Sequence, residues 1–118
     1  FRTGRIDIGD SSNNTSIGEG AGDAYTTGNN NIALGKNALT AATTGGANVA
    51  VGINALDVNT TGASNVSVGY RALSGNTTAS SNTAVGYDAL LTNTTGTMNA
   101  AFGAYALQAT TTANYNSA

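Results

Sequence analysis

A fixed 17-residue period governs the whole sequence after its first 13 residues. Glycines recur at this spacing, at Gly18, Gly35, Gly52, Gly69, Gly86 and Gly103. An asparagine lies four residues before each glycine, at Asn14, Asn31, Asn48, Asn65, Asn82 and Asn99. No insertion breaks the period, and Asn116 begins a further, partial repeat. Such a period indicates a repeat architecture, in which each unit packs on its neighbours and cannot bury its apolar face alone.

Between each asparagine and its glycine, aliphatic residues alternate with small ones. The aliphatic columns contain Ile32, Val49 and Val66, and, two positions later, Ile17, Leu34, Val51, Val68, Val85 and Phe102. The small residues between them are Ser16, Ala33, Ala50, Ser67, Ala84 and Ala101. A spacing of two places side chains on one face of a β-strand. The alternation therefore predicts a strand with the aliphatic columns inside the protein and the small residues on a flat outer face.

Each glycine is followed by an alanine column and then a leucine column. The alanines are Ala21, Ala38, Ala55, Ala72, Ala89 and Ala106, and the leucines are Leu39, Leu56, Leu73, Leu90 and Leu107. We interpret this part as a second short strand whose leucines close a thin core. Asn59-Thr60-Thr61-Gly62 and its equivalents supply turn residues, and no segment shows the spacing of a helix.

These columns predict an all-β fold, a parallel β-solenoid (β-roll) of about six 17-residue coils over residues 14–118. Residues 1–13 lie outside the register and are expected to form an N-terminal cap or assembly segment, in which Ile6-Asp7-Ile8-Gly9 is typical of a short strand. That strand would either cap its own first coil or pair with the last coil of a neighbouring molecule. Since the last repeat shows no cap, we expect another copy to cover one end, or the native chain to continue.

The asparagine column predicts a structural ladder. A buried amide at the corner of each coil can hydrogen-bond to the coils above and below it. We therefore assign Asn14, Asn31, Asn48, Asn65, Asn82 and Asn99 to this ladder. An exposed row of amides that binds a ligand is the alternative.

The richest surface in the sequence combines tyrosines with charged residues, at Tyr70, Arg71, Tyr87, Asp88 and Tyr105. Amphipathic rings beside fixed charges are favoured at interfaces and at sugar-binding sites. This set is the candidate surface-binding patch, and a structural stack of tyrosines is the alternative. Stacked coils also place Glu19 beside Lys36 and Arg71 beside Asp88, which supports the register.

Composition argues against catalysis and against several kinds of partner. The chain has no Cys or His, and its six acidic residues are dispersed, so we expect no enzyme activity, no catalytic residues, no cofactor and no metal site. Four cationic residues and a net charge of −2 argue against nucleic acid as a partner. No apolar run of about 20 residues is present, so we expect no insertion into a membrane.

Two further columns carry weaker alternatives. Threonines repeat in adjacent positions, as in Thr60 and Thr61, which suggests an ice-binding array, although neighbouring strand residues point to opposite faces. Asn59, Asn76 and Asn93 begin N-x-[ST] sequons in a turn that we expect to be exposed, and the turn itself is the simpler explanation of this motif.

The segments Asn48-Val49-Ala50-Val51-Gly52 and Asn82-Thr83-Ala84-Val85-Gly86 resemble the head repeats of trimeric autotransporter adhesins. The longer unit, as in residues 82–98, is similar to β-roll repeats of phage tail-fibre and related surface proteins. The resemblance covers residues 14–118 and implies a parallel β-roll, usually a homotrimer, on a cell surface or virion. The period of this chain is about three residues longer than the adhesin pattern, and no binding residue transfers from it.

The function predicted from the sequence is a structural or adhesive fibre segment of an extracellular, cell-surface or virion protein. We expect the partners to be copies of itself in a homotrimer, together with cell-surface glycans or matrix. A trimer would bury the face of Ala33, Ala50, Ala84 and Ala101 between chains. The alternative is a subunit of an extracellular filament of solenoids stacked end to end, and an ice-binding module is more distant.

Overall fold

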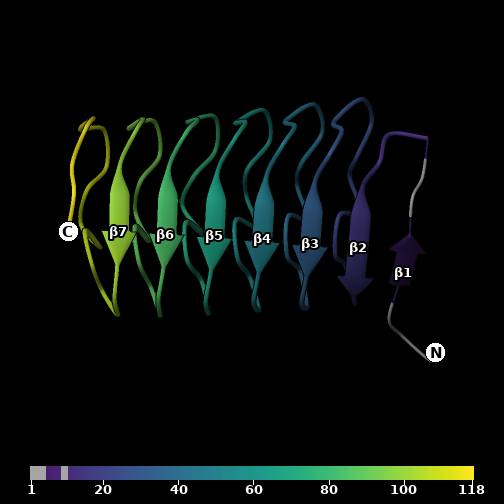
Figure 1. Ribbon diagram of the computed structural model, residues 1–118, viewed down its shortest axis with the longest axis horizontal. Helices are drawn as coiled ribbons and strands as arrows, with labels where there is room; N and C mark the ends of the chain where they lie inside the picture. The colour runs from purple at the N-terminus through teal and green to yellow at the C-terminus, as the bar shows by residue number, and fades with distance from the viewer. Residues whose placement is uncertain (1–4, 9–10) are drawn as a thin grey trace.

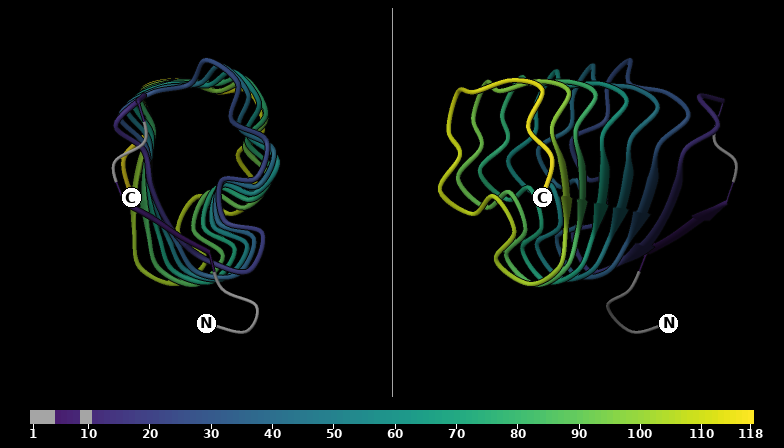
Figure 2. Two further views of the ribbon diagram at one scale, coloured as in Figure 1. Left: turned by 90° about the vertical axis from the view of Figure 1, so that its right-hand side faces the viewer. Right: turned by 60° about the vertical axis from the view of Figure 1, so that its left-hand side comes forward.

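The computed structural model describes residues 5–8 and 11–118 and is built of short strands joined by turns. The strands are β1 (Arg5–Ile8), β2 (Thr15–Gly18), β3 (Ile32–Leu34), β4 (Val49–Val51), β5 (Val66–Val68), β6 (Thr83–Val85) and β7 (Ala100–Phe102). Over the described residues they form one sheet, with the strands side by side in chain order (Figure 1). The coils superimpose when viewed along the stack (Figure 2), so the predicted all-β parallel solenoid is confirmed.

The register of the sheet follows the sequence period without a shift. Ile32 pairs with Val49, Val49 with Val66, and Val66 with Thr83, each partner being the equivalent residue of the next coil. Each strand therefore uses its backbone N–H and C=O groups to bond the coils before and after it. A one-residue slip would exchange the two faces of a strand, so the alternating pattern fixes this register.

The two faces of the strand are the reverse of the prediction. Ala33, Ala50, Ala84 and Ala101 are fully buried, whereas Ile17, Ile32 and Phe102 are 42%, 41% and 62% exposed. The expectation that the alanine face packs between chains is therefore wrong, because this face already lines the interior of its own coil.

The cause of this reversal is the narrow interior of each coil. The Ser67 hydroxyl donates a hydrogen bond of 2.6 Å to the carbonyl of Ala72, which lies in the segment facing the strand. At such a close approach only small side chains fit on the inner face of the strand. The aliphatic columns must then point outward, although their alternation is that of an ordinary half-buried strand.

The segment after each glycine is a series of turns and not the predicted second strand. In the third coil, Ala55 and Leu56 are adjacent and both fully buried, whereas neighbouring residues of a regular strand point to opposite faces. Positive φ angles at Asn54 (54°) and Leu56 (54°) redirect the backbone and turn both side chains inward. The interior position expected for the leucines is confirmed, since Leu39, Leu56, Leu73 and Leu90 are fully buried.

The two ends of the solenoid differ. β1 runs antiparallel to β2, with Arg5 opposite Gly18 and Ile8 opposite Thr15, so it covers the outer edge of the first coil. Within one chain, the N-terminal strand is thus placed as a cap on its own first coil, and pairing with a neighbouring molecule stays a prediction. At the other end, the segment that contains Ser117 lies parallel to β7 and forms a bridge between Ala100 and Ser117.

Candidate functional site

The predicted asparagine ladder lies inside the solenoid at one corner of each coil. Asn31, Asn48, Asn65 and Asn82 are fully buried, and Asn14 and Asn99 are 2% and 1% exposed. The Asn48 Nδ2 donates to the carbonyl of Gly62 at 2.9 Å within the same coil, and its Oδ1 accepts the backbone N–H of Asn65 at 3.0 Å. The side chain thus joins its own turn to the next coil. These side chains satisfy buried backbone groups and are not available to a ligand.

A second, shorter ladder was not anticipated from the sequence. Asn59, Asn76 and Asn93 are fully buried, and the Asn76 Nδ2 donates to the Asn59 Oδ1 at 2.9 Å. The prediction that these three asparagines are exposed in a turn is therefore wrong, and in the folded chain their sequons are closed to glycosylation. The sequence carried no signal for this burial, because an N-T-T-G turn that begins with a buried amide has the same composition as an exposed one.

Replacing Asn65 by Ala tests the ladder. The carbonyl of Ala79 would keep the hydrogen bond from Asn76 Nδ2 at 3.0 Å, but the buried N–H of Asn82 would lose its acceptor. One unsatisfied buried group costs about 1–3 kcal/mol, so we expect the free energy of unfolding in urea to fall by that amount. Asn29→Ala, at an exposed position, should change it by less than about 0.5 kcal/mol. Equal effects of the two substitutions would contradict the structural role.

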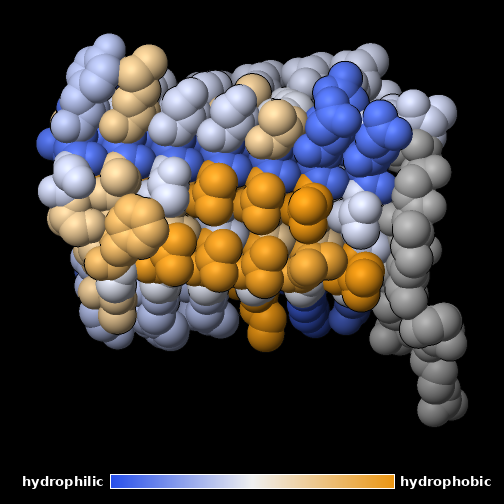
Figure 3. Space-filling view, viewed as in Figure 1, coloured by the Kyte–Doolittle hydropathy of each residue, from blue (hydrophilic) through white to orange (hydrophobic). Residues whose placement is uncertain are grey.

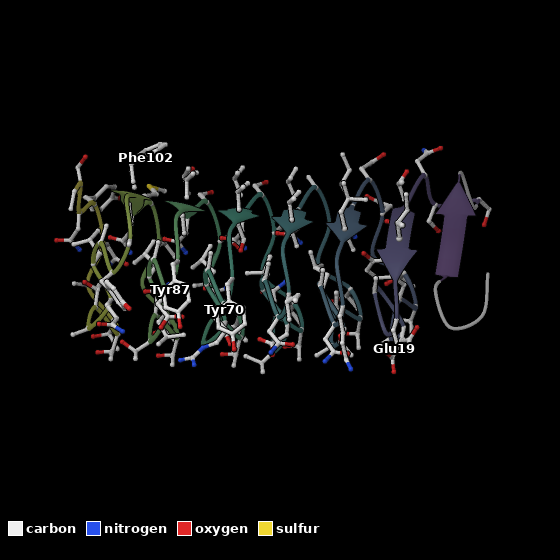
Figure 4. All side chains as sticks on the ribbon, turned by 90° about the horizontal axis from the view of Figure 1, so that it is seen from below. Glu19, Tyr70, Tyr87 and Phe102 are labelled. Carbon is white, nitrogen blue, oxygen red and sulfur yellow. The ribbon has the colours of Figure 1, made fainter. Side chains whose placement is uncertain are left out.

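The candidate surface-binding patch is a ridge on the outside of the coil turns. The tyrosine row, Tyr70, Tyr87 and Tyr105, is 40%, 46% and 56% exposed. The Tyr70 and Tyr87 ring centroids lie 5.2 Å apart with an interplanar angle of 17°, and the Tyr87 and Tyr105 rings meet edge to face at 5.4 Å. Figure 4 shows Tyr70 and Tyr87 side by side on neighbouring coils, with Phe102 on a different side of the solenoid.

The charged members of the patch connect the same two coils as the stacked rings. Arg71 Nε lies 3.3 Å from Asp88 Oδ1, and the Arg71 guanidinium carbon lies 5.8 Å from the centre of the Tyr70 ring. The Asp88 side chain is only 7% exposed, whereas that of Arg71 is 38% exposed. The structure therefore brings all five predicted patch residues together. Their charges are largely engaged with each other, and the described residues form no pocket around them.

One carboxyl group near the patch has a shifted pKa. Burial raises the pKa of Asp57 above its ordinary value of 3.8, while hydrogen bonds from Ser74 and from the backbone, and the charge of Arg71, oppose the rise. The Ser74 hydroxyl donates to Asp57 Oδ1 at 2.8 Å. The ionised form of Asp57 is thus penalised by folding.

The sign of this shift predicts a pH dependence. The folded state binds the Asp57 proton more tightly than the unfolded state, so the contribution of this group to stability falls as pH rises from about 3.8 through the raised pKa. We expect wild type to lose stability relative to Asp57→Asn over this window, measured by urea unfolding at several pH values. Ser74→Ala should enlarge the difference, because it removes an opposing hydrogen bond. If wild type instead gained stability relative to Asp57→Asn as pH rises through this window, the pKa of Asp57 could not be raised by folding.

The second notable surface was missed by the sequence analysis and lies on the outer face of the strands. We call it the apolar strip and define it as Ile17, Ile32, Leu34, Val49, Val51, Val66, Val68, Val85 and Phe102. Figure 3 shows these residues as two neighbouring rows of hydrophobic side chains across the sheet. All of them are half-buried or exposed, and all belong to the outward positions of β2 to β7. The alternation revealed these columns, but nothing in it distinguished the inner face from the outer.

Comparison with protein-family models, curated proteins and solved structures gives no match for this chain. Residues 5–8 and 11–118 contain no helix that could span a membrane and no group of three or more acidic side chains placed to hold a metal ion. Fold and surface geometry are therefore the basis for assigning a function.

Proposed function

We propose that the chain is a structural fibre segment of an extracellular, cell-surface or virion protein, and that it works as a homotrimer of laterally packed copies without enzyme activity. The observation that supports this most directly is the apolar strip. An uncharged, regular face of apolar side chains is costly to leave in water, and patches of this size are often functional. The tyrosine row then remains on the outside, where it is available for adhesion to glycans or matrix.

A copy of the same chain is the partner that matches the strip most completely. Its aliphatic rows repeat at the spacing of adjacent strands, about 4.8 Å, and an array with the same spacing can pack against every coil in the same way. None of the chain's Asp, Glu, Lys or Arg residues belongs to the strip, so no charge would be buried unpaired. A cyclic arrangement would bring three strips to one axis.

The size of the strip sets the expected strength of assembly. Six strands at about 4.8 Å and three residues of about 3.4 Å each give a face of roughly 300 Å². A stable pairwise interface needs about 800 Å² from each partner. The strip alone is smaller than that, so we expect association that depends on protein concentration. Closure of a three-membered ring and contacts beside the strip would add to the stability of the oligomer.

Two alternatives fit the surface less well. End-to-end stacking into a filament requires free strand edges, and β1 already occupies the outer edge of β2. Ice binding requires two regular exposed ranks, but the hydroxyls of Thr43 and Thr60 donate to carbonyls of the following coils at 3.2 and 3.1 Å. One rank, which includes Thr61, is left exposed.

Charge substitutions on the strip test the proposal. We expect Val49→Lys and Val66→Lys to convert oligomer to monomer with unchanged circular dichroism, because each lysine would be buried between chains but can reach water on a single chain. Thr61→Lys, on an exposed turn away from the strip, should leave the molar mass by light scattering unchanged. Ala50→Lys should instead unfold the chain, since Ala50 is fully buried. An oligomer that survives both strip substitutions, or a wild-type chain that stays monomeric at every concentration, would refute lateral assembly.

A further inference from the structure

We propose that Tyr70 and Tyr87 form an oxidative coupling site, at which a peroxide acting through a peroxidase joins the two rings covalently within one chain. The two residues are equivalent positions of adjacent coils. Their rings are nearly parallel, with centroids 5.2 Å apart, and both are partly open to solvent, at 40% and 46% exposure. Figure 4 shows both side chains on the outside of the ribbon, where an oxidant can reach them.

The chemistry requires two one-electron oxidations. Each phenol loses one electron and one proton and becomes a phenoxyl radical whose unpaired spin is shared with the ring carbons beside the hydroxyl. Two such carbons form one C–C bond, and the proton on each of these carbons is then transferred, through solvent, to a phenolic oxygen, which restores both phenols. One hydrogen peroxide accepts the two electrons and two protons removed overall and yields two waters. The product is dityrosine, lighter by two hydrogens than the pair of tyrosines.

Pre-alignment is what distinguishes this pair from other exposed tyrosines. Holding two reactants in contact raises their effective concentration by many orders of magnitude over free encounter. The ion pair between Arg71 and Asp88 joins the same two coils one position further along, with Arg71 beside the Tyr70 ring, and so it keeps the rings in register. The spin of a phenoxyl radical lies in π orbitals that extend from the ring faces, and the stacked Tyr70 and Tyr87 rings turn these faces toward each other. Tyr105 meets Tyr87 edge to face at 63°, which is a less favourable alignment for this overlap.

The expected consequence is a covalent link between adjacent coils. The new bond would close a loop from residue 70 to residue 87, and cross-links of this kind restrict the unfolded chain. A single chain suffices for the coupling, so it is independent of lateral assembly. A fibre segment hardened in this way would resist the opening of its central coils.

Tryptic peptides show whether Tyr70 is joined to a tyrosine of the C-terminal part of the chain. Cleavage after Lys36 and Arg71 leaves Tyr70 as the only tyrosine of peptide 37–71, whereas Tyr87, Tyr105 and Tyr115 belong to peptide 72–118. After dilute protein is treated with hydrogen peroxide and peroxidase, we expect dityrosine fluorescence and a monomer lighter by two hydrogens. Digestion of that monomer should give peptides 37–71 and 72–118 joined together.

Matched variants identify the partners. Tyr70→Phe and Tyr87→Phe should each abolish the joined peptide, while Tyr115→Phe, at a position that is 75% exposed and outside the row, should leave its yield unchanged. Unfolding in urea before oxidation should lower the yield roughly tenfold or more, because the rings are then no longer held together. A joined peptide that persists in Tyr87→Phe, a yield insensitive to unfolding, or products found only between two chains would each overturn the proposal.

Discussion

Gly52→Ala is expected to lower the free energy of unfolding by about 2–6 kcal/mol, because it combines backbone strain of about 1–3 kcal/mol with overpacking of similar size. The φ angle of Gly52 is 133°, a conformation that residues with a Cβ rarely adopt. A Cβ at this position would lie 2.5 Å from the carbonyl oxygen of Gly69 in the next coil. That oxygen belongs to backbone, so it cannot move aside as the end of a side chain can.

Gly103→Ala separates the two costs in Gly52→Ala. Gly103 has a similar φ of 121°, but no atom lies within 4 Å of the position of its Cβ. We therefore expect only the strain of about 1–3 kcal/mol at Gly103, with the difference between the variants reporting the clash between coils. Urea unfolding of both variants measures these values. Equal losses would show that coils are not stacked closely through the glycine column.

Leu73→Ala should lower the free energy of unfolding by about 2–5 kcal/mol, the usual cost of truncating a fully buried leucine. Leu73 lies in the continuous line of Leu39, Leu56, Leu73 and Leu90, all without exposed surface. The coil cannot collapse around the lost atoms, since its strand and turn are both tied to neighbouring coils by backbone hydrogen bonds.

Val68→Ala is the control for the leucine line. Val68 lies on the outward face of β5, so under monomeric conditions its truncation should cost less than about 1 kcal/mol. The same urea titrations report both variants. If Leu73→Ala cost less than about 0.5 kcal/mol, the leucine column would have to lie at the surface.

The period, the parallel register and the buried leucines could be predicted because each depends on equivalence between coils, which a repeat displays directly. The sequence pattern could not predict which face of each strand lies inside the coil. The alternation of Val49, Ala50 and Val51 does not show which face of the strand lies inside. The valines were expected inside because they are the more hydrophobic residues. What decides the matter is the distance to the opposite wall of the coil, where only alanine or serine fits. That distance depends on the positive φ angles of residues such as Asn54 and Leu56, and the pattern of residue types does not predict these angles.

In the candidate site, too, some features could be predicted from the sequence and others could not. The grouping of Tyr70, Arg71, Tyr87 and Asp88 followed from the period alone, because equivalent positions of adjacent coils must be neighbours. The burial of Asn59 did not follow, because an amide that closes a turn and an amide exposed on a turn share one sequence motif. The apolar strip was missed because its aliphatic residues were predicted to lie inside the coil, whereas they lie on its outer face.

The hydrogen bonds between coils point along the axis of the stack, as in the bond of 2.8 Å from the Val49 N–H to the carbonyl of Asn65. A pull along this axis therefore stretches these bonds along their length, and coil boundaries can open one at a time instead of shearing many strands together. Each boundary that opens releases the 17 residues of one coil. These residues span roughly 55–60 Å when extended, whereas the folded coil occupies about 4.8 Å along the axis. Under tension such a rod would lengthen about twelvefold in steps. The coil is thus a unit of extensibility as well as a unit of folding.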